Sequence, residues 1–481
     1  MEKVVKAHYI KYSWISDDPR LIAKAEELAE LRKAKQIRKS KRPLADAFNA
    51  ILTSFEVLGV YSGDELRIPT NINLYNANTR RNPSYTTEVL DALKFLINEL
   101  YIDKTADRKR YRLNYKDIWL PFRYSITPKW LEEVSDKPLS DVSLVRRNPL
   151  MPYTELRKDV WVKDNKGKQQ KTKVATPVPK NQQRQHRAML DMTDQVLSSY
   201  DDLIRQVQVT IGDTAIHPAQ LFLTRVFSKG SLELGGRLYS SIQNTKKKLR
   251  WHINLNGDPT IEVDYWSIHP YLAYHSRDIA FTGDDPYTID GFDRDLVKVA
   301  FNIMINRKGY KGHESAAKTL SSDLNIGMVE ATQLEQAIQE RHTPIADLFN
   351  SGAGLELQRL DSTIALQVLK SFIDRGIPII PIHDSFIVSV RYTEDLILTM
   401  RDCYYEVLYS SQPPLDKQSF KGIKAEHRDY TEPMLEAIQC CFEGNTEDMD
   451  DLYWDNLINN EPVQAPPRVE QDCVVVDEGI E

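Results

Sequence analysis

The chain has 481 residues, which is too long for one ordinary hydrophobic core and predicts about two to four domains. Its apolar fraction of 41% is enough to fold them, and no stretch approaches the roughly 18 consecutive apolar residues of a membrane helix. The first residues, MEKVVKAHYIKYSW, lack the apolar region of a signal peptide, so we expect a cytoplasmic protein without membrane association.

The net charge of −6 conceals an uneven distribution. Residues 443–481 carry 12 acidic residues and one basic residue, which leaves the rest of the chain at about +5. Two basic runs lie in that rest, one at residues 32–42 and one at 157–187. A single basic run is usually a solvated face, but two of them beside an acidic tail favour a polyanionic partner. The tail itself is expected to be disordered and is a candidate surface for a protein partner.

The first predicted elements are two amphipathic helices. One begins after Pro43 in LADAFNAILTSFEVLGVY, and the other follows the polar segment 84–87 in EVLDALKFLINEL. Residues 101–115, YIDKTADRKRYRLNY, combine an apolar start, a charged tip and a return rich in Tyr and Arg, which predicts a hairpin. Helices followed by a basic hairpin resemble a winged helix. A small helical domain with an incidental hairpin explains the pattern equally well.

Further along, residues 150–185 are polar, basic and poor in apolar side chains, which predicts a flexible connection that touches a polyanion. A helical pattern returns from His186 to Tyr200, and residues 220–440 are denser in apolar runs, with strands and helices mixed. We therefore divide the chain into an N-terminal domain (1–125), a basic linker region (126–185), a helical region (186–235), a core (236–440) and the acidic tail (441–481).

Two stretches of the core place an aspartate where the pattern indicates a buried strand. Asp384 interrupts IIPIHDSFIV (379–388), and Asp264 ends the strand pattern of TIEVDYW and precedes a helix. A buried carboxylate is costly unless a cation neutralises it, and Mg²⁺ takes one or two carboxylates together with phosphate oxygens. The two aspartates are therefore candidate ligands of one divalent site. Alternatively, each is a separately hydrogen-bonded turn residue.

Between these aspartates, FDRDLVKVAFNIMINR (292–307) predicts a helix with a polar row at four-residue spacing. The row consists of Arg294, Lys298, Asn302 and Asn306, while the opposite face is apolar. Two cations followed by two amides, beside an acidic metal site, suit a nucleoside triphosphate. The cations would meet the phosphates and the amides would lie nearer the sugar and base.

The order D-Y-x-S, R-x-x-x-K-x-x-x-N-x-x-x-N and H-D-S resembles the three motifs of family A DNA polymerases and the related single-subunit RNA polymerases. The resemblance covers roughly residues 220–410 and points to a divergent member of phage or mobile-element type. It implies an α+β fold: a right-hand palm with an antiparallel sheet, helical fingers and, in 186–235, a reduced thumb-like region.

The resemblance also implies roles for individual residues. Asp264, Asp384 and the Tyr265 carbonyl would hold two Mg²⁺ ions, for which Mn²⁺ would substitute. Arg294 and Lys298 would bind the triphosphate, with Lys298 a candidate proton donor.

Further contacts are implied around that centre. His383 would lie next to the primer terminus. GGRLYSSIQNTKKKLR (235–250) resembles a segment in which Arg237 and Arg250 would contact primer, template or triphosphate. In the helix before the third motif, either Glu356 or Gln358 takes the position of the family's glutamine.

Several positions depart from the family pattern. Asn302 and Asn306 replace aromatic residues, and His269 stands where the DNA polymerases carry a glutamate. A histidine there is bulky enough to crowd a 2′-hydroxyl, which favours deoxynucleotides. The alternative is that His269-Pro270 forms a structural turn without contact to the sugar. Ser385 matches the RNA polymerase branch and therefore favours ribonucleotides. The 120 residues between the two aspartates leave a compact fingers region. The lack of an exonuclease-type acidic cluster before residue 220 argues against proofreading.

The sequence thus predicts a template-directed nucleotidyltransferase acting on a DNA primer–template and nucleoside triphosphates, foremost a DNA-dependent DNA polymerase without proofreading. One alternative is a primase or RNA polymerase on the same palm. Another is a non-catalytic DNA-binding replication protein, against which the retention of both aspartates and both cations argues. The sugar, the nature of the template and the source of the primer stay open.

Overall fold

The computed structural model describes most of the chain up to residue 409 and one later strand. The described residues are 7–9, 14–34, 44–57, 65–68, 87–106, 110–113, 116–119, 122–139, 141–148, 151–163, 169–212, 214–245, 247–281, 285–309, 315–409 and 423–426. The acidic tail lies outside them.

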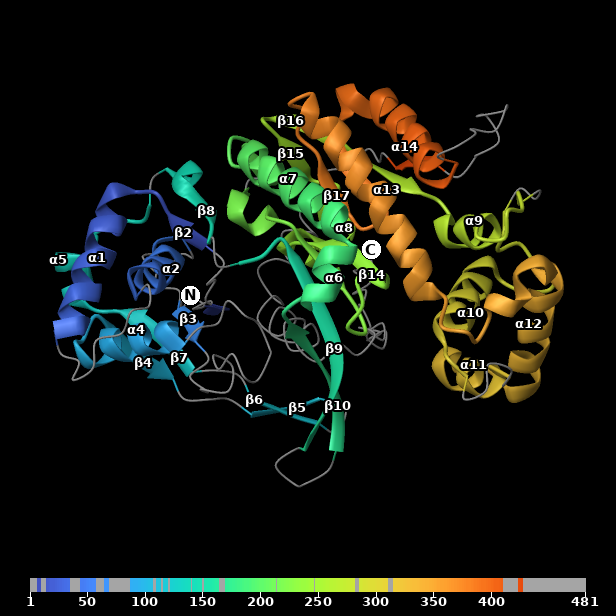
Figure 1. Cartoon of the computed structure of the whole chain (residues 1–481), viewed down its shortest axis with the longest axis horizontal. Coiled ribbons are helices and arrows are strands. Elements are labelled where there is room, and N and C mark those ends of the chain that lie inside the picture. The colour runs from blue at the N-terminus through green and yellow to red at the C-terminus, as the bar shows by residue number, and fades with distance from the viewer. Residues whose placement is uncertain are drawn as a thin grey trace, which may run out of the picture.

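The N-terminal part combines helices with a small sheet (Figure 1). The helices are α1 (Pro19–Ala34), α2 (Leu44–Val57), α4 (Thr87–Asn98) and α5 (Pro128–Glu133). The sheet has the order β1-β3-β7-β4, from strands Ala7–Tyr9, Glu65–Ile68, Phe122–Ile126 and Ile102–Ala106. Both helices expected from the sequence, α2 and α4, are confirmed.

The predicted hairpin at residues 101–115 is wrong in its pairing. β4 pairs with β7, and β5 (Arg110–Leu113) pairs with β6 (Lys116–Trp119) instead of returning along β4. A pattern of charged and aromatic residues indicates strands but does not select their partners. The sheet of this part is mixed, because β1 and β3 run parallel.

The flexible connection expected at residues 150–185 is also wrong, because most of this segment forms strands and a helix. β8 (Val145–Arg147) pairs with β2 (Trp14–Ser16), and β9 (Thr154–Lys163) and β10 (Gln169–Thr176) form a long antiparallel ribbon. The many charged residues of β9 hide its strand pattern in the sequence, so composition alone favours a linker. The ribbon joins β13 (Thr224–Phe227) and β14 (Gly235–Tyr239) in a sheet of order β10-β9-β13-β14.

Residues 186–235 are helical only in their first half. Helix α6 (Lys180–Gln185) leads into α7 (Arg187–Ile204), which matches the helical pattern seen from His186. The second half instead supplies strands β11 (Val209–Ile211), β12 (Thr214–Ile216) and β13 to two different sheets.

An antiparallel sheet forms the centre of the molecule, as expected from the sequence. Its order is β12-β11-β15-β16-β18-β17, with β19 (Ile423–Glu426) also paired to β16. The remaining strands are β15 (Ile253–Leu255), β16 (Asp258–Tyr265), β17 (Ile380–Ile382) and β18 (Ser385–Ser389). All of these strands pair in the antiparallel sense.

Helices cover the sheet and form a second lobe. α13 (Gly354–Asp374) packs against β14, α7 and α9 (Ile268–His275), and α14 (Thr393–Leu408) packs against α13 and the sheet. α10 (Arg294–Asn306), α11 (Ala317–Leu324) and α12 (Met328–Arg341) gather at the end of α13, at the right of Figure 1. The short helix α8 (Lys247–Arg250) precedes β15.

One continuous apolar core links the N-terminal helices, the central sheet and the helical lobe. A second, small core of Leu156, Phe227 and Leu232 lies at the base of the β9–β10 ribbon. Among the helices that the structure describes, none is both long and apolar enough to cross a bilayer.

Candidate active site

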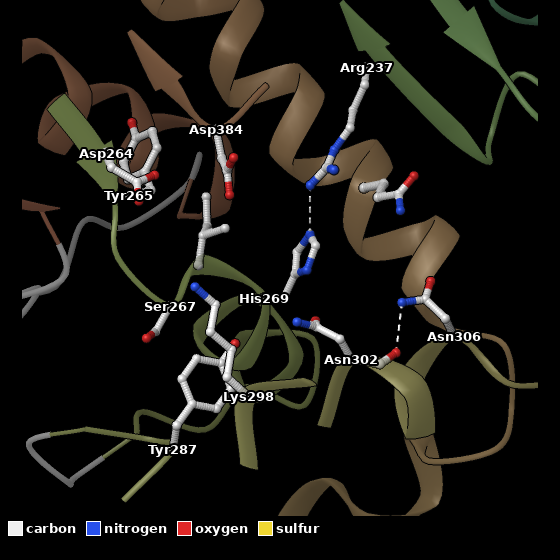
Figure 2. A pocket seen from close by; sticks show the side chains of 12 residues that line it. Arg237, Asp264, Tyr265, Ser267, His269, Tyr287, Lys298, Asn302, Asn306 and Asp384 are labelled. Atoms are coloured by element: carbon white, nitrogen blue, oxygen red, sulfur yellow. Dashed lines mark hydrogen bonds between the residues drawn. The ribbon is translucent and has the colours of Figure 1, made fainter. Parts of the chain in front are cut away.

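A polar cleft lies where the central sheet meets the helical lobe (Figure 2). Its volume is about 300 Å³, and its lining comes from β14, β16, α9, α10, α13 and the β17–β18 turn. The lining residues are Arg237, Asp264, Tyr265, Ser267, Ile268, His269, Tyr287, Lys298, Asn302, Asn306, Gln358 and Asp384. Most of the residues predicted from the three motifs are therefore brought to one cleft.

The two aspartates meet because β16 and β18 are neighbours. Asp264 is the register partner of Ser385, and the Tyr265 N–H donates to the Asp384 carbonyl at 3.2 Å, which fixes the turn against the end of β16. Contrary to the expectation, Asp384 lies not within a strand but in the two-residue turn between Ile382 and Ser385. In Figure 2 both carboxylates point into the same space.

Backbone strain accompanies this turn and the end of β16. His383 has a φ of 57° and Ser267 a φ of 62°, a left-handed conformation that non-glycine residues adopt at a cost of about 1–2 kcal/mol. Each strained residue lies within three positions of a cleft aspartate. The Ser267 hydroxyl and the His383 Nδ1 are buried without a hydrogen-bond partner among the described residues.

The surroundings of Asp264 disfavour its charged form. Burial, followed by the charges of Asp384 and Glu262, raises the pKa of Asp264 to about 7, while Lys298 acts in the opposite direction. A cation placed between the aspartates would relieve this repulsion, and carboxylate oxygens are ligands that Mg²⁺ prefers. The residues present therefore fit a divalent ion, although no group of three or more Asp, Glu, His or Cys side chains gathers as a metal site in the described part of the chain.

A second set of contacts holds the end of β16 beside Asp264. Glu262 lies two residues before Asp264 on β16, and it binds Arg250 through both carboxylate oxygens at 3.1 and 3.0 Å. The Ser385 hydroxyl donates to the same carboxylate at 2.7 Å. Arg250 is not part of the cleft lining; the structure pairs it with Glu262, whose charge it neutralises.

Three of the four residues in the polar row of α10 line the cleft. Lys298, Asn302 and Asn306 line it, and Asp293 caps the helix by accepting from the N–H groups of Asp295 and Leu296. The other face of the helix is apolar and packed, as predicted, and its buried residues are Val297, Ala300, Phe301, Met304 and Ile305. Leu296 and Ile303, also expected on this face, are partly buried.

Arg294 is engaged at the edge of the cleft. Its Nε donates to Asp285 at 2.5 Å, and its guanidinium lies 4.7 Å from the Trp266 ring centroid and 5.5 Å from that of Tyr287. Its Nη2 is buried without a hydrogen-bond partner among the described residues. One donor is thus left for an incoming acceptor.

The side chain of Tyr265 points out of the cleft. Its ring is buried against Phe386 and Tyr404, and its hydroxyl donates to the Met400 carbonyl. Only the backbone of Tyr265 is therefore available to a metal, and its ring is not available to a nucleotide. Gln358, rather than Glu356, lines the cleft.

His383 packs beside the cleft, with its ring edge-on to Tyr239 at a centroid distance of 5.1 Å. Burial, and next the charge of Arg237, lower the pKa of its imidazole to about 4, so that the ring is neutral at pH 7.

Two residues that the motifs do not reveal complete the site. Asp361 on α13 is 1% exposed and accepts two hydrogen bonds from Arg237, whose Nη2 also lies 3.1 Å from His269 Nε2. Tyr287, from the loop before α10, places a ring in the cleft although Asn302 and Asn306 carry none. Helical spacing in 356–369 marks a helix that contains Asp361, but its partners are set by tertiary packing.

No protein-family model and no curated protein matches the chain. A solved structure to which it is similar is the POL domain of Pol1 from M. smegmatis, in a complex with a DNA primer–template and dNTP. The similarity has a TM-score of 0.30 and 14% identity, and covers 47% of this chain and 49% of that one, about half its length.

Proposed function

We propose that this chain is a template-directed nucleotidyltransferase that extends a nucleic-acid 3′ end with deoxynucleoside triphosphates. The observation that carries the proposal is the meeting of Asp264 and Asp384 at the ends of paired strands, facing Lys298 of α10 across one cleft. Carboxylates on one wall and a cation on the other suit a triphosphate whose charge is shared between metal and lysine.

In this proposal Asp264 and Asp384 hold Mg²⁺ or Mn²⁺ through their carboxylates, with the Tyr265 carbonyl as a further oxygen. When bound, the metal lowers the pKa of the attacking hydroxyl and neutralises the leaving pyrophosphate. Lys298 Nζ binds the phosphates and is placed to give a proton to the departing group. Arg294, through its unpaired Nη2, adds a second phosphate contact at the edge of the cleft.

Asn302 and Asn306 lie on the side of the cleft away from the aspartates (Figure 2), where the sugar and base would be placed, and Gln358 lines the same cleft. Their amides supply donors and acceptors that do not depend on base identity, since template pairing provides the sequence information. Arg237 and His383 lie next to the aspartates and are proposed as contacts on the primer side. Arg237 has a second role, because it also holds His269 in place.

The preference for deoxynucleotides is supported by His269. Its ring is held by Arg237 and lies 3.6 Å from Asp361, so that it cannot swing away freely from a 2′-hydroxyl. The serine of H-D-S, whose resemblance to the RNA polymerase branch favours ribonucleotides, has a structural explanation in its hydrogen bond to Glu262.

Primer extension tests the proposal. A labelled primer on a DNA template is incubated with Mg²⁺ and either dNTPs or NTPs, alongside a reaction without primer. We expect extension with dNTPs, and its loss by a factor of about 10³ or more in Asp384→Ala and Asp264→Ala, since both hold the metal. Asp258→Ala is the matched control, because Asp258 lies on the same strand but outside the cleft.

Each other outcome is informative. Products from NTPs, above all without primer, would assign the chain to the primase or RNA polymerase class. Extension that survives Asp384→Ala would contradict the proposed site. Absence of any product from the unmodified chain, with DNA still bound, would favour a binding protein without catalysis.

A further inference from the structure

The ribbon of β9 and β10 extends beyond the body of the protein. β13 pairs only with Thr154, Glu155 and Leu156 of β9, so residues 157–163 pair with β10 alone among the strands that the structure describes. The turn after β13 follows the ribbon as far as Asp159, because the Gly230 N–H donates to the Arg157 carbonyl and Lys229 pairs with Asp159. Beyond these contacts, residues 160–163 extend about 13 Å at about 3.3 Å per residue. Figure 1 shows the ribbon projecting away from the central sheet. A two-stranded ribbon is only marginally stable through its own contacts, so we expect a binding partner to stabilise it.

The base of the ribbon is firmly fixed. Leu156 packs in the small core with Phe227 and Leu232. Next to this core, Arg225 of β13 is fully buried and donates to the Gly236 carbonyl, to Thr193 of α7 and to Ser362 of α13. The base of the ribbon is therefore fixed to α7 and to α13, and α13 also lines the cleft through Gln358.

Trp161 is the most unusual side chain of the ribbon. It is 68% exposed, although tryptophan is the residue with most to gain from burial. No ring contact, hydrogen bond or ion pair joins its side chain to another residue in the part of the chain that the structure describes. A broad aromatic face is thus presented to solvent by a supported strand, which is typical of a binding surface.

The charge of the ribbon around this tryptophan is positive. Lys171 is its register partner on β10, and Asp159, two residues before it on β9, is already paired with Lys229 at 2.5 Å. Beyond residue 156, the two described strands carry three further lysines and no further acid; the lysines are Lys158, Lys163 and Lys173. An aromatic face among lysines is complementary to a strand with stacked bases and a phosphate backbone.

The ribbon is also continuous with the cleft. Across the sheet β10-β9-β13-β14, the last strand carries Arg237, which lines the cleft together with Asp384. A nucleic-acid strand that leaves the cleft along this sheet would meet the ribbon. The placement favours nucleic acid over a protein as the partner.

We infer that the β9–β10 ribbon binds a single-stranded segment of nucleic acid, with a base stacked on Trp161 and phosphates neutralised by the ribbon lysines. This inference rests on the proposed function for its choice of partner. It goes beyond that function in assigning a second contact, outside the cleft, to unpaired template or displaced strand.

Binding of labelled oligonucleotides to the full chain, followed by fluorescence anisotropy in EDTA without nucleotide, tests the inference apart from catalysis. The ligands are a single-stranded DNA, the same DNA with a central run of abasic sites, and a blunt duplex. The loss variant is Trp161→Thr, which removes the ring but keeps a strand-forming residue. Trp161→Phe is the conservative variant, and Leu131→Ala, an exposed apolar residue on α5, is the matched control.

We expect Trp161→Thr to weaken binding of the single strand by about 5- to 100-fold, since stacking on one base has this effect. Trp161→Phe should retain most of the affinity for the single strand, and Leu131→Ala should retain all of it. The affinity lost in Trp161→Thr should be smaller for the abasic strand and for the duplex, because neither offers an unpaired base to the ring. Trp161→Thr should leave the salt dependence unchanged, whereas Lys171→Ala should reduce the slope of log K against log salt by about 0.7.

Equal binding by Trp161→Thr and the unmodified chain, with unchanged thermal unfolding, would overturn the inference and leave Trp161 as a protein-binding residue. If Trp161→Thr weakened binding of the abasic strand or of the duplex as much as it weakens binding of the intact single strand, the proposed stacking of a base on Trp161 would be wrong. If the unmodified chain bound none of the oligonucleotides, the proposed function would fail together with the inference. Binding that is retained but insensitive to Trp161 would end the inference alone.

Discussion

Arg237 and Asp361 form a buried ion pair that joins β14 to α13, with hydrogen bonds of 2.9 and 2.7 Å to one carboxylate oxygen. Burial alone would raise the pKa of Asp361, but Arg237 and His269 outweigh it and lower that pKa to about 2. The carboxylate is thus ionised at neutral and mildly acidic pH. Arg237 in turn holds His269 at 3.1 Å, which makes Asp361 a positioning residue for the cleft.

His269→Ala should relax discrimination against ribonucleotides by roughly tenfold or more, because the volume facing the sugar is removed. The measurement is the ratio of kcat/KM for a dNTP and the matching NTP in primer extension. His275→Ala, on the same helix but outside the cleft, is the control and should leave the ratio unchanged. A ratio that does not move in His269→Ala would show that this histidine is a structural turn residue.

Asp361→Asn should move the same ratio in the same direction, because Arg237 loses its anionic partner and no longer fixes His269. Breaking one side of a buried ion pair costs about 3–5 kcal/mol, so we also expect a lower midpoint of urea unfolding. The double variant Asp361→Asn/His269→Ala should show no greater loss of discrimination than His269→Ala. Additive losses would mean that the two residues act independently.

Ser385→Ala should destabilise the fold by about 1–2 kcal/mol while leaving the choice of sugar unchanged. The buried Ser385 hydroxyl donates to Glu262, and its removal deprives that carboxylate of one partner while Arg250 remains. Denaturant unfolding gives the stability, and competition between dNTP and NTP gives the selectivity. A shift in selectivity without loss of stability would return this serine to a role in substrate choice.

Gly354→Ala should perturb the cleft through Asn306. A Cβ at position 354 would collide with the Asn306 Oδ1, so the amide must leave its place and its hydrogen bond to the Asn302 carbonyl. We expect a raised KM for the nucleotide with a small change in stability, since only the end of a side chain has to move. Asn306→Ala should give the same KM, and the double variant should be no worse. An unchanged KM in both single variants would remove Asn306 from the nucleotide site.

His342 should make the helical lobe sensitive to acid. Its Nε2 faces the Pro286 carbonyl at 2.9 Å and its Nδ1 the Tyr274 hydroxyl at 3.2 Å, an arrangement that suits a neutral ring donating from Nε2. Burial lowers the pKa of His342 from 6.5 to about 4. The stability that this gives is fully present above pH 6.5 and is lost as pH falls from there through 4, up to about 3 kcal/mol.

Thermal unfolding between pH 7.5 and 4.5 measures this effect. The unmodified chain should lose stability steeply below pH 6.5, and His342→Gln, less stable at pH 7.5, should show a flatter profile. Parallel profiles for the two proteins would assign the acid sensitivity to other groups, of which His217, also buried with a lowered pKa, is the first to test.

Several features of the site follow from residue type and local spacing. The four-residue spacing from Arg294 to Asn306 indicates α10 and its packed face, and three of its four polar residues do line the cleft. Likewise, the pattern around Asp264 predicts the end of a strand followed by a helix, as β16 and α9 show. These features are local, because they depend on periodicity and residue type over one or two turns of chain.

Tertiary structure decides which of these local features meet and what supports them. Asp361 lies 124 residues from Arg237, and Ser385 lies 123 from Glu262, so neither partner is marked by any spacing in the sequence. The ribbon of residues 154–176 has the composition of a linker, because its charged residues mask the pattern of a strand whose partner is another strand. Residue types and their local spacing thus identify the candidate site residues of the chain. Strand register and helix packing, which depend on long-range burial, decide where those residues are assembled.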